Sequence, residues 1–370
     1  MSLAILNRFK EEEHMTVKSK VQVPDIFFMP EWGKAYESQD QGESRIFEVK
    51  NAIGHIFYSF VLRPIPILAG ETLYYDTVTP FGQNGPIILK CQPGKKAELI
   101  ASFDQEFQIY CTQHNIVAEY IRFSAWLKNV EDFKDIYSID NRGITMYIDL
   151  TVQDFFMEEF KSPTRQQVRR ALKNNVQIEY DFTGESIQEF HRLYQIMAKR
   201  NDVPAYYLFS EELLKNSFEL LEGKQFIVYV KHEGVAISAA LFVHHGDYLH
   251  YHLAANDPAY FHLAGNSLLI NEGCRWGVEH GKKELHLGGA STEALYRFKR
   301  GFTKTEPLDI LTGKKYGIRK LINCFPISKR EVKESKTLHI SRCIEAKMRK
   351  EPSAIESGRF FYACTFWISL

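Results

Sequence analysis

The chain has 370 residues, of which 45% are hydrophobic, 14% are aromatic and 25% are charged, with 46 basic side chains balancing 46 acidic ones. This length favours two domains, since single cores usually stop growing at roughly 250–300 residues, and the composition excludes a mainly disordered chain. Because the sequence has no apolar run near the ~18 residues of a membrane-spanning helix, no signal-peptide pattern at its N-terminus and six scattered cysteines, we expect a cytoplasmic protein with reduced thiols.

The first half of the chain consists mainly of strand patterns. Apolar or alternating segments predict strands at 45–49, 55–64, 73–80, 116–123 and 145–150. A helix is predicted over 96–114, because four large apolar side chains recur on one face, at Leu99, Phe103, Phe107 and Tyr110. Thr151, three residues before Asp154, is expected to cap the next helix. This places a domain boundary near residue 150.

The second half of the chain contains more helix. Its predicted elements are, in order, a helix at 152–174 interrupted near residues 162–163, a strand at 176–182, helices at 185–200 and 210–221, strands at 224–231, 235–244 and 248–254, a helix at 266–280, a strand at 284–287, a short helix at 294–300 and a strand at 310–316. Short turns join the three consecutive strands into an antiparallel meander. Helices before such a meander, with a helix and a strand after it, follow the running order of the GNAT acyltransferase fold.

The loop that enters the helix at residue 266 is the first candidate ligand site, with His262, Gly265, Asn266 and Ser267 as its donor-binding residues. A helix N-terminus presents unpaired N–H groups and the positive end of the helix dipole, so it can hold a pyrophosphate or carboxylate. Gly265 would let the ligand approach the backbone closely. The GNAT signature here is Gln/Arg-x-x-Gly-x-Gly/Ala, whereas this chain has His-x-x-Gly-x-Ser. The alternative is an Asn- or Ser-capped helix without a ligand.

A second candidate site joins a strand that ends in two glycines, at residues 288–289, to the short helix that follows. Arg297, Phe298, Lys299 and Arg300 place cations around an aromatic ring within about one helical turn. Cations at that point can stabilise a developing oxyanion or bind a donor phosphate. We therefore assign Arg297 to substrate binding. The alternative is that Phe298 belongs to the core face of the helix and that the cations are solvated.

Candidates for a general base are His252, His286 and Glu293. His titrates near neutral pH, which suits removal of a proton from an amine acceptor, although each candidate has a structural role as its alternative. His250 and His252 share one face of a strand by period two. No carboxylate or cysteine stands at a suitable spacing to complete a zinc site, so we expect no metal.

Asp76 and Arg122 are the candidates for the acceptor side. Asp76 leaves a strand into a glycine-rich loop, and Arg122 lies in a strand of the same half. Arg122 would hold a phosphate or carboxylate of a sugar or cell-envelope precursor in bidentate fashion. The alternative is an internal Asp–Arg pair that holds the loop. Arg165, Arg169 and Arg170, on one predicted helix, are candidates for either role.

Charge is unevenly distributed near the C-terminus. Residues 314–350 contain twelve Lys or Arg and three Glu, an excess of nine positive charges. Such a segment can bind phosphates, nucleic acid or an anionic membrane surface, and a solvated helical face is the alternative. The aromatic tail after Arg359 is uncharged. We expect it to pack as a terminal element, with an interfacial membrane anchor as the alternative.

Several stretches resemble Fem-type GNAT acyltransferases, a family that includes peptidoglycan-bridge aminoacyltransferases. They lie in the right order between about residue 24 and residue 316, at 74–86, 120–123, 251–253, 286–289 and 298–302. The most specific are Tyr-Tyr-Asp followed by Pro-Phe-Gly and Gly-Pro in the first, and Phe-Lys-Arg-Gly-Phe in the last. The resemblance implies two GNAT-like domains and transfer of an acyl or aminoacyl group to an amine without a metal. It also implies that Phe298 and Lys299 lie at the reaction centre, where Lys299 stabilises the tetrahedral intermediate.

These observations predict an α+β protein with two GNAT-like domains, each a mixed, mostly antiparallel sheet flanked by helices. We expect an acceptor-side domain at 1–150, a domain with the donor site and the chemistry at 151–320, and a basic and aromatic extension at 321–370. The expected activity is transfer of an acetyl-like group from acyl-CoA to an amine of a sugar or cell-envelope precursor. We expect no tightly bound cofactor, no DNA and no transmembrane segment, and we leave peripheral membrane contact open.

Two alternatives to this activity remain open. The first is a Fem-type enzyme that uses aminoacyl-tRNA on a peptidoglycan precursor; tRNA is not favoured, because the sequence shows no long helical-hairpin arm of the kind such enzymes often carry. The second is a non-catalytic module that keeps the fold and binds a glycan or precursor.

Overall fold

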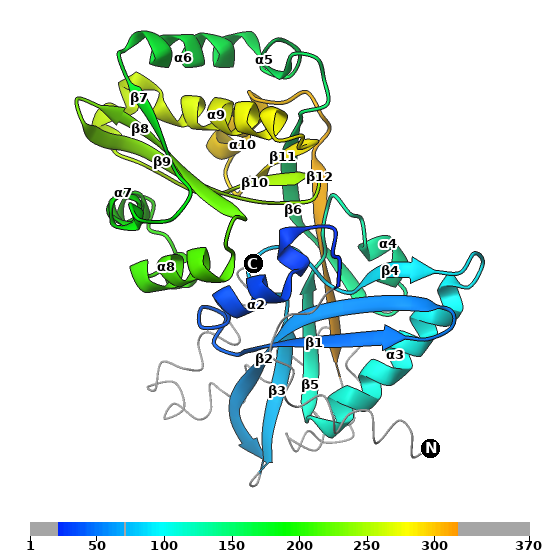
Figure 1. Ribbon diagram of the computed structural model, residues 1–370. Coiled ribbons are helices and arrows are strands. Elements are labelled where there is room, and N and C mark those ends of the chain that lie inside the picture. Colours follow the sequence, from blue (N-terminus) through cyan, green and yellow to red (C-terminus); the bar gives the residue numbers. More distant parts are fainter. Residues whose placement is uncertain (1–20, 70–71, 317–370) are drawn as a thin grey trace.

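The computed structural model describes residues 21–69 and 72–316 (Figure 1). The expected extension at 321–370, with the aromatic tail, lies outside the described residues. Of the basic segment that begins at residue 314, the structure describes two lysines. Lys314 pairs with Asp140 at 2.6 Å, and Lys315 pairs with Asp104.

The described strands form one continuous sheet of twelve strands in the order β1-β2-β3-β5-β12-β6-β11-β10-β9-β8-β7, with β4 paired to β2. The strands of the first half are β1 (Glu43–Lys50), β2 (Gly54–Ala69), β3 (Thr72–Val78), β4 (Ile87–Cys91), β5 (Ile116–Arg122) and β6 (Ser138–Asp149). Those of the second half are β7 (Gln177–Asp181), β8 (Gln225–His232), β9 (Val235–His245), β10 (Tyr248–Asn256), β11 (Glu284–Gly289) and β12 (Leu308–Tyr316).

Helices flank this sheet on both faces (Figure 1). In the first half they are η1 (Ile26–Phe28), α2 (Pro30–Tyr36), α3 (Lys96–Gln113) and α4 (Val130–Phe133). In the second half they are α5 (Phe155–Glu158), α6 (Ser162–Lys173), α7 (Ile187–Arg200), η2 (Ala205–Tyr207), α8 (Glu211–Leu220), η3 (Pro258–Leu263), α9 (Gly265–Glu279) and α10 (Glu293–Arg300).

Strand β8, next to the edge strand β7, shows why the second half has helices on both faces. Residues 225–230 are all buried, as expected for a strand covered on both sides. Phe226 and Val228 pack into the cluster that holds α6 and α9, whereas Ile227 and Tyr229 pack into the cluster that holds α7 and α8. Successive side chains of β8 point to opposite faces of the sheet, so this one strand contributes to two separate hydrophobic cores.

The two halves of the chain are interwoven. β12 lies between β5 and β6 and is antiparallel to both, so a strand from the end of the described chain completes the first half of the sheet. The N-terminal segment with η1 and α2 packs into the core beneath α7 and α8. β6 ends at Asp149, but the sheet continues without a break, and the division into domains at residue 150 stays a prediction.

Most predicted elements are confirmed to within a few residues, including the three-strand meander and the helix at 96–113. The predicted Thr151 cap is wrong. Asp154 caps α5 by accepting a hydrogen bond from the Met157 N–H at 3.1 Å, while both the N–H and the hydroxyl of Thr151 donate to Asp149. Thr151 therefore belongs to a turn after β6, because the carboxylate of Asp149 accepts hydrogen bonds from both its N–H and its hydroxyl. Local sequence pattern did not predict α2, β4, α4, the short helices η1, η2 and η3, or the first half of β6.

Candidate active site

Two parallel strands separate at the centre of the sheet. β10 and β11 pair over only three positions, and the last pair is His250 with His286. Beyond it, β10 carries a bulge near Tyr251, and the pairing of β11 with β6 shifts register after His286. We call the point where β10 and β11 separate the fork. Beyond it, the backbone N–H and C=O groups of the two strands no longer pair with each other. The fork is therefore the place where a substrate can meet strand backbone inside the sheet.

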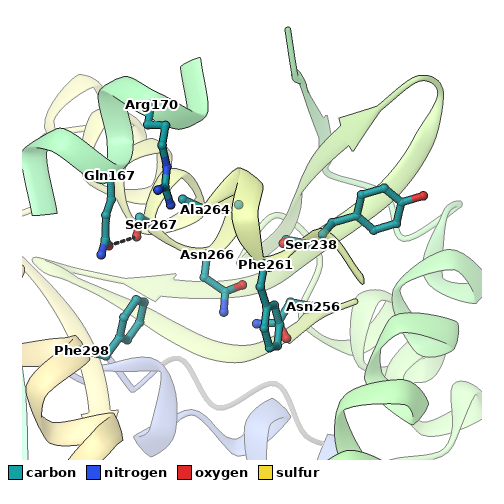
Figure 2. A pocket seen from close by; sticks show the side chains of 11 residues that line it. Gln167, Arg170, Ser238, Asn256, Phe261, Ala264, Asn266, Ser267 and Phe298 are labelled. Carbon is teal, nitrogen blue, oxygen red and sulfur yellow. Dashed lines mark hydrogen bonds between the residues drawn. The ribbon is translucent and has the colours of Figure 1, made fainter. Parts of the chain in front are cut away.

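A pocket of about 290 Å³ opens at the start of α9 (Figure 2). Residues from α6, β9, β10, η3, α9 and α10, and the residue between η3 and α9, line it: Gln167, Arg170, Ser238, Asn256, Tyr260, Phe261, Ala264, Gly265, Asn266, Ser267 and Phe298. Three of the four residues predicted to bind the donor are among them. The fourth, His262, is exposed on η3 and does not line the pocket.

The backbone at the pocket is shaped by two neighbouring residues. Ala264 precedes α9 in the left-handed region, with φ at 57°, a conformation that costs a non-glycine residue free energy and that occurs often at functional sites. Gly265 is required by packing: a Cβ there would lie 2.4 Å from the Ser238 hydroxyl oxygen and 3.0 Å from Ser238 Cβ. The glycine thus brings α9 against β9, a reason that sequence analysis did not consider.

Some polar side chains of the pocket form hydrogen bonds within the protein and others do not. The Ser267 hydroxyl donates to Gln167 Oε1 at 2.9 Å, which joins α9 to α6. The side-chain oxygen of Asn266 is buried without a hydrogen-bond partner among the described residues. Arg170 is exposed, lines the pocket and makes no ion pair within the described part of the chain. The pocket therefore offers an unused acceptor, a free cation and the N-terminus of a 15-residue helix.

Helix α10 separates the predicted reaction-centre residues into two environments. Phe298 lines the pocket, and the neighbouring Lys299 is buried, with 8% of its surface exposed. Lys299 Nζ donates a hydrogen bond of 2.6 Å to the Gly289 carbonyl oxygen. Burial lowers the pKa of Lys299 to about 8. Glu293 and Arg297 instead pair with each other at 2.7 Å on the exposed face of α10, because residues four apart on a helix are neighbours.

The predicted histidines occupy two aromatic environments on the face of the sheet that packs against the N-terminal segment. His252 Nε2 hydrogen-bonds to the Tyr36 hydroxyl at 2.8 Å, and burial lowers the pKa of this histidine to about 3. His286 is 2% exposed, and burial lowers its pKa to about 4, although the neighbouring Glu284 acts to raise it. Between them, His250 bonds to the fully buried Asp25 at 2.8 Å.

The two candidate acceptor residues of the first half do not pair with each other. Asp76 forms a bidentate pair with Arg63, through distances of 2.9 and 2.8 Å. Arg122 donates to the Thr79 carbonyl oxygen at 3.0 Å. Burial opposes the charge of Arg122, but Tyr206 and the carboxylate of Asp40 raise its pKa, so that it stays charged.

The structure thus brings together Gly265, Asn266, Ser267 and Phe298 at one pocket, with Lys299 next in sequence, and leaves the other predicted residues in separate environments. Sequence reasoning missed Gln167 as a pocket residue and did not choose Arg170 over its neighbours. Their three-residue spacing on α6 was the available signal, since it places both on one face. Among the described residues, no group of three or more His, Cys, Asp or Glu could hold a metal ion. None of the described helices is long and apolar enough to cross a membrane.

Residues 161–300 match the family model described as an acetyltransferase (GNAT) domain. The matched segment runs from the start of α6 to the end of α10 and contains every residue that lines the pocket. No curated protein matches the sequence.

Among solved structures, the fold resembles the crystal structure of FemX, with a TM-score of 0.63 and 14% identity over 82% of this chain and 95% of that chain. Similarity to L-PGS from Bacillus licheniformis is weaker, with a TM-score of 0.48 and 14% identity over 83% of this chain and 98% of that chain. At such identities the likeness concerns the fold alone. Together with the family match, the likeness to FemX confirms the expected GNAT-like fold.

Proposed function

We propose that this chain, an acyltransferase that carries a GNAT domain, transfers an acyl group from acyl-CoA to an amine of a sugar or cell-envelope precursor in the cytoplasm. The donor would occupy the pocket at the start of α9. The observation that carries the proposal is the adjacency of two residues of α10. Phe298 lines the pocket, and Lys299 is a buried cation that pairs with no carboxylate of the described residues.

The chemistry of the pocket supports donor binding. Arg170 and the N–H groups of Gly265 and Asn266, which precede the first hydrogen bonds of α9, suit the negative charge of a pyrophosphate. The unpartnered side-chain oxygen of Asn266 would accept a hydrogen bond from a donor amide N–H. Phe261 and Phe298 supply apolar walls for an extended chain. No step of this binding uses His262.

Lys299 would act on the oxygen of the reacting carbonyl. When the amine nitrogen forms a bond to the acyl carbon, the carbonyl electron pair moves to oxygen. It returns when the carbon–sulfur bond breaks and the thiolate leaves. The Lys299 ammonium would donate a hydrogen bond to this oxygen, where a buried and unpaired cation is most effective. Because its pKa is about 8, most Lys299 side chains are still protonated at pH 7.

His286 is the proposed proton acceptor. The nitrogen that attacks becomes acidic once it bonds to carbon, so that a weak base can take its proton. His286 is neutral near pH 7; its Nε2 contacts Glu284 Oε2 at 2.9 Å, and its Nδ1 has no hydrogen-bond partner among the described residues. His252 is already engaged by Tyr36. Glu293 lies on the exposed face of α10, paired with Arg297, where it would meet solvent.

Calorimetric titration of the full chain with acetyl-CoA, combined with an assay of free thiol released in the presence of amines, tests this function. We expect binding at micromolar concentrations and thiol release that requires an amine. A chain that binds no acetyl-CoA and releases no thiol with any amine would rule the proposal out.

A Fem-type aminoacyl transfer to a peptidoglycan precursor is the second candidate, favoured by the fold similarity to FemX. Binding of aminoacyl-tRNA, measured at 50 and 200 mM salt, separates the candidates. Tight binding that falls steeply with salt, and that weakens when Lys and Arg of 314–350 are neutralised, would favour tRNA over acyl-CoA. A chain that binds precursor but supports no transfer from either donor would instead be a binding module.

A further inference from the structure

A second group of side chains lies on the face of β11 opposite to α9. Leu285 and Leu287 point into the core beneath α9, so that Glu284 and His286 lie on the other face of the strand. Around His286 stand three aromatic side chains from three different elements: Trp126 after β5, Tyr147 from β6 and Tyr248 from β10. We call Trp126, Tyr147, Tyr248, Glu284 and His286 the His286 cluster.

Aromatic rings surround His286. Its ring centroid lies 4.4 Å from that of Trp126, 5.6 Å from that of Tyr147 and 5.8 Å from that of Tyr248. The three aromatic residues are partly exposed, and the side chain of Glu284 is 29% exposed. The cluster therefore reaches the surface, while its histidine is almost fully buried.

Polar atoms of the cluster are buried without hydrogen-bond partners among the described residues. These atoms are both ring nitrogens of His286, Oε2 of Glu284 and Nε1 of Trp126. His286 Nε2 and Glu284 Oε2 are 2.9 Å apart and form an ion-pair contact without hydrogen-bond alignment, whereas His286 Nδ1 and Trp126 Nε1 have neither a hydrogen-bond nor an ion-pair partner among the described residues. Leaving a buried polar atom unpaired costs about 1–3 kcal/mol, so such a concentration of unpaired atoms in one place requires an explanation.

Neighbouring histidines show that the fold can satisfy such groups. His250 stacks on His286 at 5.1 Å and bonds to Asp25, and His252 bonds to Tyr36. Most buried side-chain polar atoms in proteins have such a partner, so the buried His286 Nδ1 and Trp126 Nε1 remain to be explained. The polar groups of the cluster comprise one N–H donor and one acceptor nitrogen on the neutral His286, the acceptor oxygens of Glu284 and one donor on Trp126, in an aromatic surrounding. A ligand that complements them carries N–H donors with positive charge and, close by, an oxygen acceptor.

We propose that the His286 cluster binds the primary ammonium group of the acceptor substrate, with Trp126 Nε1 donating to a hydroxyl or carboxylate oxygen beside that amine. This assignment rests on the proposed acyl transfer. The substrate class is an amine with a neighbouring oxygen, as in an amino sugar or an amino acid. Glu284 and the aromatic faces select the charge. The bound ammonium gives up one proton to solvent before its nitrogen attacks, and His286 accepts the second proton, from the N–H group that it holds, once the bond to the acyl carbon has formed.

The position of the cluster agrees with this role. His286 is the last residue of β11 that pairs with β10, so the cluster lies at the fork. Gly289, whose carbonyl oxygen accepts the hydrogen bond from Lys299, is three residues farther along the same strand, roughly 10 Å away at the rise of a strand. An acyl group held between these points could meet the amine on one side and Lys299 on the other.

Ligand-observed NMR of the full chain at pH 7.0 tests the proposal with two pairs of probes. Glucosamine is compared with N-acetylglucosamine, and L-alanine with N-acetyl-L-alanine. Acetylation removes the positive charge of the amine and adds an acetyl group to its nitrogen, and it leaves the remainder of each molecule unchanged. We expect at least one amine to bind ten times more tightly than its acetylated form. Which pair responds distinguishes a sugar acceptor from an amino-acid acceptor. Equal binding within both pairs would overturn the proposal.

Variants locate the binding. Glu284→Gln and Trp126→Leu are expected to weaken binding of the amine at least fivefold, whereas Glu279→Gln, a matched change on the exposed end of α9, should leave it unchanged. Thermal melting checks that each variant is folded. Because Glu284 is partly exposed, Glu284→Gln keeps the test valid if Trp126→Leu does not fold. Amine binding that Glu284→Gln does not change would refute the assignment.

Measuring acetyl-CoA binding alongside amine binding distinguishes failure of the cluster assignment from failure of the proposed function. If the chain binds acetyl-CoA and transfers its acyl group while Glu284→Gln leaves the KM for the amine unchanged, the cluster assignment fails and the function stands. If amines bind at the cluster and acetyl-CoA does not bind, the function fails and the cluster remains an amine site.

Discussion

Lys299 donates a 2.6 Å hydrogen bond to the carbonyl oxygen of Gly289, and within the described residues this bond is the one polar contact that holds its buried ammonium group. Burial without a carboxylate partner is unfavourable for a lysine. A carbonyl oxygen satisfies only one of the three N–H donors of the group. The side chain is thus well suited to a negative charge that appears only during a reaction.

Replacing Lys299 with Met should lower turnover by about 10²–10³-fold, the usual loss when one oxyanion donor is removed. The variant should melt at or above the wild-type temperature, since it removes a desolvated cation and keeps a side chain of similar length. Steady-state thiol release and thermal melting measure the two effects. Lys304→Met, on the exposed loop after α10, is the control. Unchanged turnover of Lys299→Met would show that the lysine has no part in the chemistry.

The activity should decline as the pH rises through about 8, because Lys299 then loses the proton that it donates. In Lys299→Arg, whose guanidinium remains charged at any accessible pH, this alkaline decline should shift upward, whatever its effect on the maximal rate. Profiles of kcat against pH from 6 to 10 for both proteins provide the measurement. An alkaline limb at the same pH in both would assign it to another group.

Acetyl-CoA binding should weaken about tenfold in Arg170→Gln, because this cation lines the pocket and has no competing partner in the described part of the chain. The residual binding should depend less on salt than that of the wild type. Arg169→Gln is a matched control on the same helix, since Arg169 lies over the Phe156 ring at 5.3 Å instead of lining the pocket. Titration calorimetry at two salt concentrations compares the three proteins, and equal losses in both variants would contradict a specific role for Arg170.

Gly265→Ala should destabilise the protein by about 1–3 kcal/mol, because the new Cβ would lie 2.4 Å from the Ser238 hydroxyl oxygen. Adding Ser238→Gly should restore much of this loss, since it removes the atoms in the way. Urea unfolding of both variants gives the free energies of unfolding. A Gly265→Ala protein of normal stability that no longer binds acetyl-CoA would show instead that the glycine makes room for the ligand.

The stability of the first half should depend on Glu119, a carboxyl buried in β5 that accepts a hydrogen bond from Tyr137 at 3.0 Å. Burial raises its pKa to about 7. The native state therefore binds a proton that the unfolded state has released, and the stabilisation from this group, full below pH 4.5, is lost as the pH rises through 7. Relative to Glu119→Gln, the wild type should lose roughly 3 kcal/mol of unfolding free energy between pH 4.5 and pH 8. Parallel pH curves for the two proteins would show that Glu119 does not titrate in this range.

Much of the secondary structure could be predicted from local pattern. The four apolar side chains of α3 recur at helical spacing and do pack on β1, β2 and β5. The start of α9 is predicted as a ligand site because a glycine, an amide and a hydroxyl mark a helix N-terminus, and these residues do line the pocket. The Thr151 cap failed because Thr and Asp side chains form turns as readily as caps, and the choice depends on which donor lies nearest.

The sequence by itself determined most of the elements, their order and the identity of the chemically distinctive segments, since helical and strand periods and the Phe-Lys-Arg-Gly-Phe motif are local properties of the chain. Only the tertiary structure decided which of these residues meet. In it, β12 lies between two strands of the first half, and Asp25 forms a hydrogen bond with His250, which is 225 residues away in the sequence. It also buries Lys299 without a carboxylate and gathers Trp126 and Tyr147 around His286. Such contacts depend on which strands share a ladder and on which face of the sheet each side chain lies, and no local pattern specifies either.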